Sequence, residues 1–128
     1  MKKPSAPTNA ELDILHVLWD HGTATVRQVH EYLARTKTAQ YTTTLKQMQV
    51  MTDKGLVMRD DSERSHVYRP AITREQVQRQ TAHHLLHRVF QGSARTLLME
   101  ALGVQPASKK ELADLKQLIV DYEKGRMR

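Results

Sequence analysis

The chain of 128 residues contains no cysteine. That absence excludes disulfides, zinc ribbons and thiol catalysis, and it is typical of a cytoplasmic protein. Aromatic residues make up only 5% of the chain, so the core is expected to consist mainly of Leu, Val, Ile, Met and Ala. With five glycines in all, the chain has no glycine-rich loop to cradle a phosphate.

Long apolar runs are also missing. None approaches the roughly 18 residues that a membrane-spanning helix needs, and no apolar segment follows the first lysines as in a signal peptide. We therefore expect a cytoplasmic protein without membrane insertion. The motifs of zinc proteases, serine hydrolases, P-loop enzymes and dinucleotide-binding enzymes are absent, so we expect no enzymatic activity and no cofactor.

Basic residues outnumber acidic ones by 20 to 14, which gives a formal net charge of +6. The excess is strongest locally between residues 35 and 59, where five basic residues accompany one acidic residue. A basic stretch favours a polyanionic partner, although most charge runs are simply solvated.

Capping boxes mark the first helix starts. Thr8 and Glu11 form one such pattern, and Thr25 and Gln28 form the next, each before an apolar face at helical spacing. A third amphipathic segment ends before Gly55. The predicted helices cover about 9–21, 26–35 and 41–54.

After the third helix the period changes. Leu56–Arg59 and His66–Arg69 are short β-prone segments, the charged stretch 60–65 lies between them, and Pro70 closes the second. This pattern predicts a β-hairpin. Three helices followed by a hairpin is the element order of a winged helix-turn-helix.

The chain from residue 73 onward reads as helix only. Thr73 and Ser108 begin capping patterns, and breaks at Gly92-Ser93 and 103–106 delimit three short amphipathic helices. They could fold back on the first domain, but so small a unit rarely supplies its own core, which favours pairing with a second copy. The candidate dimerisation residues are Leu85, Leu86, Val89, Phe90, Leu97, Leu98, Leu102, Leu112, Leu115, Leu118 and Ile119.

The overall prediction is a mainly α protein with a small β-hairpin wing. Residues 1–72 are predicted to form a winged helix-turn-helix domain that binds DNA. Residues 73–128 are predicted to form a three-helix C-terminal dimerisation domain.

The third helix begins with a run of threonines, which are poor helix formers. On a helical wheel Thr42, Thr43 and Lys46 point outward, whereas Thr44 points inward. Helix N-termini offer N–H groups to phosphate, and Thr and Lys bind phosphates or base edges. The alternative is a cluster that only caps the helix. The predicted DNA-binding residues are Thr25, Gln40, Tyr41, Thr42, Thr43, Lys46, Gln47, Arg64 and Ser65.

Two other functions compete with DNA binding. His83, His84 and His87 lie together, with ligand-like spacing for a divalent metal between His83 and His87, which would suit a metal-responsive regulator. No thiol or carboxylate joins them locally, so a solvated or dimer-facing cluster is favoured and no metal site is predicted. The other alternative is a winged helix that docks a protein and ignores DNA.

Several segments together resemble the penicillinase-repressor (BlaI/MecI) family of winged-helix transcriptional regulators. The resemblance runs in order and spacing from Pro7 to about Leu102 and continues more loosely through the last helix. The segments that carry it are PTNAELDILHVLW, TATVRQVHEYL, YTTTLKQMQVMTDKGLV, SHVYRPAITREQV and LLHRVFQGS.

The resemblance implies a homodimer that represses transcription by binding a palindromic operator in promoter DNA. It implies that the helix starting at Tyr41-Thr42-Thr43 reads the operator and that residues 60–66 form the wing. It further implies relief of repression by an inducing signal, through cleavage triggered by a membrane-bound sensor metalloprotease.

Two features depart from the family pattern. Well-known members are cut at an Asn-Phe bond, which this chain does not match because it has Glu100-Ala101 there; cleavage at this position would need another sequence preference. A copper-responsive branch carries C-terminal cysteine pairs, and because this chain has no cysteine, thiolate copper sensing is excluded.

Overall fold

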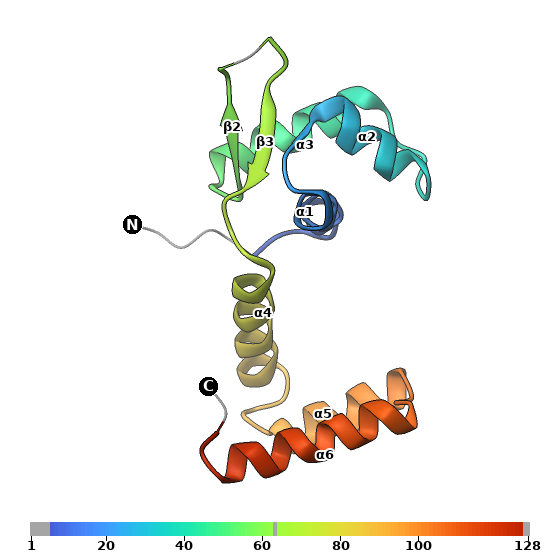
Figure 1. The fold of residues 1–128 in the computed structure, drawn as a ribbon, viewed down its shortest axis with the longest axis vertical. Helices are drawn as coiled ribbons and strands as arrows, with labels where there is room; N and C mark the ends of the chain where they lie inside the picture. Colours follow the sequence, from blue (N-terminus) through green and yellow to red (C-terminus); the bar gives the residue numbers. More distant parts are fainter. Residues whose placement is uncertain (1–5, 63, 127–128) are drawn as a thin grey trace. The chain divides into compact units, whose positions relative to one another are not determined.

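The computed structural model describes residues 6–62 and 64–126 (Figure 1). The chain divides into two compact units, one ending at His83 and the other starting at His84. None of the helices within the described ranges is long and apolar enough to cross a membrane. The elements are α1 (Asn9–His21), β1 (Ala24–Thr25), α2 (Val26–Ala34), α3 (Tyr41–Asp53), β2 (Val57–Asp60), β3 (Val67–Pro70), α4 (Arg74–Arg88), α5 (Ala94–Val104) and α6 (Lys109–Glu123).

The predicted capping boxes are confirmed. The Thr8 hydroxyl accepts from the Glu11 N–H at 3.2 Å, and the Thr8 N–H donates to the Glu11 carboxylate at 2.9 Å. Thr25 and Gln28 form the same reciprocal pair at 3.1 and 2.9 Å. α1 ends at Gly22, whose φ of +83° is the left-handed conformation that glycine adopts without strain.

The sheet has three antiparallel strands in the order β1-β3-β2, one more than the predicted hairpin. The missed strand, β1, is only two residues long and pairs with Val67 and Tyr68 of β3. Both predicted wing strands begin and end one residue too early, and Pro70 is the last residue of β3 instead of following it. Proline is tolerated there because it lies at a strand end, beyond the reach of β1.

The first unit has a continuous apolar core. Helices α1, α2 and α3 pack around it, the sheet closes one side, and the start of α4 adds Val77. The Trp19 indole N–H donates to the Ile72 carbonyl at 3.0 Å and so ties α1 to the chain that leaves the wing. The buried apolar residues are Ile14, Leu15, Leu18, Ala24, Val26, Val29, Met48, Met51, Leu56, Val57, Tyr68, Ile72 and Val77.

The second unit has no such core. Among its described residues, 84–126, none is buried. Its large exposed apolar side chains are Val89, Leu98, Met99, Val104, Leu112, Leu118, Ile119, Val120 and Tyr122.

One helix boundary in the second unit was predicted wrongly. Gly103 and Val104 belong to α5, whereas the sequence predicted a turn over 103–106. A glycine costs a helix only about 1 kcal/mol, so it does not by itself end one. The helix ends at Gln105, which has an extended backbone and precedes Pro106. The proline ring disfavours the α conformation in the residue before it, so the helix cannot continue.

Candidate nucleic-acid interface

The two faces of α3 separate as the helical wheel predicted. Thr44 is only 3% exposed and Met48 and Met51 are fully buried. Thr42, Thr43 and Lys46 are exposed. The outward face therefore carries hydroxyls and a cation near the helix start.

The threonines do not cap α3, so the cap-only interpretation is wrong. Of the six helices in the described ranges, α3 alone begins without a side-chain cap hydrogen bond; Thr or Ser caps the other five. Thr44 instead makes a hydrogen bond of 3.2 Å with His30 of α2. The His30 ring also meets Tyr41 edge-on at 5.7 Å, so α2 positions the first turn of α3.

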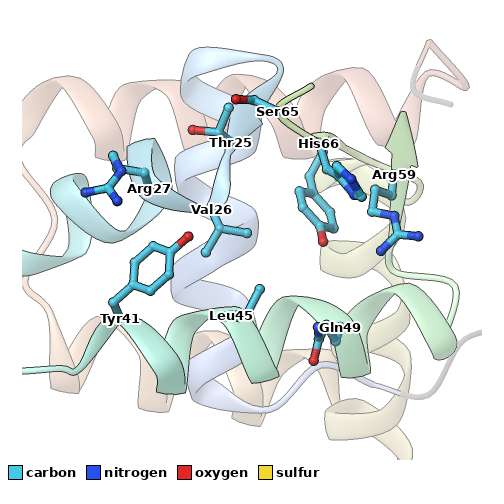
Figure 2. Close-up of a pocket in the computed structure, with 10 residues that line it drawn as sticks. Thr25, Val26, Arg27, Tyr41, Leu45, Gln49, Arg59, Ser65 and His66 are labelled. Carbon is cyan, nitrogen blue, oxygen red and sulfur yellow. The ribbon is translucent and has the colours of Figure 1, made fainter. Parts of the chain in front are cut away.

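A groove of about 390 Å³ lies between α3, the start of α2 and the wing (Figure 2). We call it the wing-side groove. Tyr41, Leu45 and Gln49 follow one another along its α3 wall, and Arg27 lies 5.4 Å from the Tyr41 ring centre. The remaining lining residues are Thr25, Val26, Arg59, Ser65, His66 and Tyr68.

A second groove, of about 430 Å³, runs along the other flank of α3 beside the start of α1. We call it the α1-side groove. Its α3 wall carries the predicted DNA-binding residues that the wing-side groove lacks. The lining residues are Thr8, Glu11, Thr42, Thr43, Lys46, Gln47, Val50 and Lys54. Helix α3 thus stands as a ridge between two grooves.

Cations that the described residues do not neutralise lie on α3, at the start of α2 and beside the wing tip. Lys46, Arg27 and Arg64 make no ion pair with any carboxylate in the described part of the chain. By contrast, the Lys54 ammonium lies 2.8 Å from the carboxylate of Glu11, which is only 1% exposed. Lys54 therefore holds α3 against α1, and Lys46 remains available to an anion.

The Glu11 carboxylate is kept charged in spite of its burial. Burial alone would raise its pKa, but the hydrogen bonds from Lys54 and Thr8 and the charge of Lys54 outweigh burial and lower the pKa below its ordinary value. The negative charge facing the α1-side groove is therefore already paired.

At the tip end of the wing, directly after β2, Asp61 contacts two basic side chains. Its carboxylate lies 2.7 Å from Arg59 Nε and 3.0 Å from His66 Nδ1. Hydrogen bonding to Tyr68, together with Asp61, raises the pKa of the Arg59 guanidinium. This end of the wing-side groove therefore carries less uncompensated positive charge than the Arg27 end.

The structure gathers most predicted DNA-binding residues around α3. Thr25, Tyr41 and Ser65 line the wing-side groove; Gln40 precedes α3, and Arg64 lies exposed beside the wing tip. Arg27 and Gln49 also line the wing-side groove but were not predicted, because no local sequence pattern singles them out. Arg59, part of the basic stretch 35–59, and His66, at the end of the wing tip, line it as well.

The histidines of α4 do not assemble into a metal centre in the structure. No group of three or more His, Cys, Asp or Glu residues placed to hold a metal ion occurs in the described ranges. The metal-responsive alternative therefore gains no geometric support.

Comparison with known proteins identifies the family. The family model for the penicillinase repressor matches residues 7–121. The chain belongs to this family. The penicillinase repressor of Bacillus licheniformis is 24% identical over 123 residues, which cover 96% of each chain. Members of the penicillinase repressor family are transcriptional repressors and not enzymes.

Solved structures from this family match the winged-helix part. The solution structure of the DNA-binding domain of the repressor BlaI superposes with a TM-score of 0.53 at 28% identity, covering 59% of this chain and 93% of that one. The monomeric form of B. licheniformis BlaI in complex with the blaP half-operator gives 0.51 at the same identity and coverage. The winged-helix fold predicted from the sequence is confirmed.

Proposed function

We propose that the protein represses transcription as a homodimer that binds a palindromic promoter operator, with α3 in the major groove. The observation that carries the proposal is the unneutralised outward face of α3, where Thr42, Thr43 and Lys46 surround an uncapped helix start. Free N–H groups, hydroxyls and a cation at a helix N-terminus suit phosphate oxygens and base edges.

The two grooves beside α3 support this placement. A major groove about 12 Å wide admits a single α-helix, and a phosphate backbone borders it on either side. The wing-side and α1-side grooves offer room for those backbones. Arg27 and Ser65 would meet one strand, and Lys46 the other.

The relatives support the same partner. BlaI, 28% identical over the winged-helix part, was solved in complex with a half-operator, and we extend that DNA binding to this chain. Double-stranded DNA is therefore favoured over a protein ligand for the winged helix.

The homodimer is inferred from the second unit. Ile119 is 52% exposed and Val104 is 83% exposed in the single chain, and no residue of 84–126 is buried. Apolar stripes left uncovered on a unit this small favour burial against a second copy. A two-fold dimer would place its two α3 helices about one helical turn of DNA apart, or a multiple of it, so the operator is proposed to be palindromic.

Relief of repression is proposed to follow proteolysis within the second unit. Glu100 and Ala101, which occupy the position of the family cleavage site, are both exposed but lie inside α5. Cleavage there would require local opening of the helix. A membrane sensor protease is the proposed agent.

Binding to selected genomic fragments tests the proposal. Lys46→Ala is expected to weaken operator binding and to lower the slope of log affinity against log salt by about one, because one phosphate contact is lost. Thr43→Ala is expected to weaken specific more than non-specific binding. Lys109→Ala removes an exposed cation of α6 and serves as the control. Unchanged affinity and salt slope in both α3 variants would contradict the assignment of α3.

A further inference from the structure

We propose that Gln49 is a specificity-determining residue that reads a base edge two turns into α3. This inference rests on the proposed function, since it assumes that α3 enters the major groove of DNA. The sequence pattern did not single Gln49 out, and it was not among the predicted DNA-binding residues.

The position of Gln49 on α3 is the first reason. It follows Thr42 by seven residues and Lys46 by three, so all three side chains lie within the outward arc of α3, Gln49 on the wing-side flank and Thr42 and Lys46 on the α1-side flank. Its side chain is exposed and makes no hydrogen bond to another side chain or to the backbone within the described ranges, residues 6–62 and 64–126. At 1.5 Å per residue, it lies about 10 Å along the axis from Thr42, still within the reach of a major-groove helix.

The chemistry of the side chain is the second reason. A carboxamide carries both N–H donors and a carbonyl acceptor. That pairing matches the N6 amino group and N7 acceptor that adenine presents in the major groove, and Gln contacts adenine there in a bidentate manner. A phosphate needs donors only, so an amide suits a base better than a backbone contact.

The charges around Gln49 are the third reason. Arg59 and His66, which share the wing-side groove with Gln49, are both bound to Asp61. Arg27, on α2, has no carboxylate partner in the described ranges and lines the same groove beside Tyr41 (Figure 2). Tyr41 lies about two helical turns before Gln49 on α3. Phosphate is therefore drawn to the Arg27 end, and a neutral base edge is left for Gln49.

Asp53, the next residue on the same side of α3, limits the part of the helix that can contact DNA. Asp53 follows Gln49 by four residues and is exposed at the end of α3. A carboxylate is repelled by phosphate oxygens, so α3 is not expected to contact the backbone beyond Gln49. Gln49 would thus be the last base-reading side chain of the helix.

Selection of bound sequences from a randomised DNA library tests the inference with the full-length protein. The wild type is expected to select an A·T pair at one fixed position in each half-site. Gln49→Ala is expected to lose discrimination at that position by roughly tenfold or more while keeping the rest of the site and the salt slope. Gln49→Glu is expected to shift that position toward cytosine, whose N4 amino group donates to a carboxylate.

Gln78→Ala, an exposed amide change on α4, is the matched control and should select the wild-type sequence. Circular dichroism of each variant verifies the fold, which an exposed side chain should not alter. If the wild type selects a clear sequence and Gln49→Ala selects the same sequence with equal discrimination, the role of Gln49 is overturned but the proposed function is not. A wild type that selects no common sequence would overturn the proposed function, and the inference with it.

Discussion

The two units of the chain differ in what holds them together. Thirteen apolar residues are buried among residues 6–62 and 64–83 of the first unit, and they come from all three helices, the sheet with its flanking residues and the start of α4. In the second unit no residue among 84–126 is buried, although its helices carry regular apolar stripes. The contrast indicates that the first unit is stabilised within one chain, and it supports our proposal that the second is stabilised by a second copy.

The strongest test of this difference between the two units is a leucine-to-alanine substitution in each of them. Leu18→Ala, in the fully buried core of the first unit, is expected to lower its free energy of unfolding by about 3 kcal/mol through lost burial and a cavity. Trp19 is the chain's single tryptophan, so its fluorescence during urea unfolding reports on this unit. The loss should not depend on protein concentration.

Leu118→Ala is the matched change in the second unit, where Leu118 is exposed in the single chain. Its effect should be seen in helix content and should grow as the protein is diluted, because dilution dissociates a dimer. An effect of Leu118→Ala that is independent of concentration would contradict the comparison.

The next largest effect is expected from a charge on the apolar face of α6. Ile119→Lys should weaken the dimer by about 2 kcal/mol or more, because the ammonium would be buried without a partner. Sedimentation velocity at a series of concentrations measures it. Lys116→Ala changes charge on the same helix outside the predicted stripe and should leave the dimer intact. A monomeric wild type would refute the proposed dimer.

A smaller effect is expected from Glu11, the one buried carboxylate among the residues of the first unit that the structure describes. Because the pKa of Glu11 in the fold is below its ordinary value of 4.5, its contribution is complete at neutral pH and is lost as the pH falls through the folded value. Glu11→Gln should cost about 2 kcal/mol at pH 7, since Lys54 loses its partner. The variant's tryptophan-monitored stability should also fall less steeply below about pH 4.5 than that of the wild type. Equal steepness in the two proteins would exclude this role for Glu11.

The features that the sequence predicts well are local. A capping box needs only two residues that are three positions apart. Thr8 with Glu11 and Thr25 with Gln28 therefore predict where their helices begin. The inward Thr44 and outward Lys46 follow from the helical period alone. The winged-helix fold was predictable because its elements are adjacent in the chain.

The features that the sequence misses depend on distant residues. β1 has only two residues, and its pairing with β3 bridges more than forty positions, so no periodicity reveals it. Arg27 and Arg59 enter one groove only because the fold brings α2 and the wing to the same side of α3. The proposed role of Gln49 likewise follows from its place in that groove and not from its neighbours in sequence.

The smallest expected effect concerns the polar surface of the second unit. Lys110 and Asp114 form an exposed i,i+4 ion pair at 3.2 Å on α6. Asp114→Ala should change stability by less than about 0.5 kcal/mol, because water and salt screen such pairs. Thermal unfolding followed by circular dichroism at low and high salt measures it, beside Leu118→Ala at the same concentration. If Asp114→Ala lowered the stability as much as Leu118→Ala, surface electrostatics would stabilise the second unit. Its exposed apolar side chains would then no longer argue for a second copy.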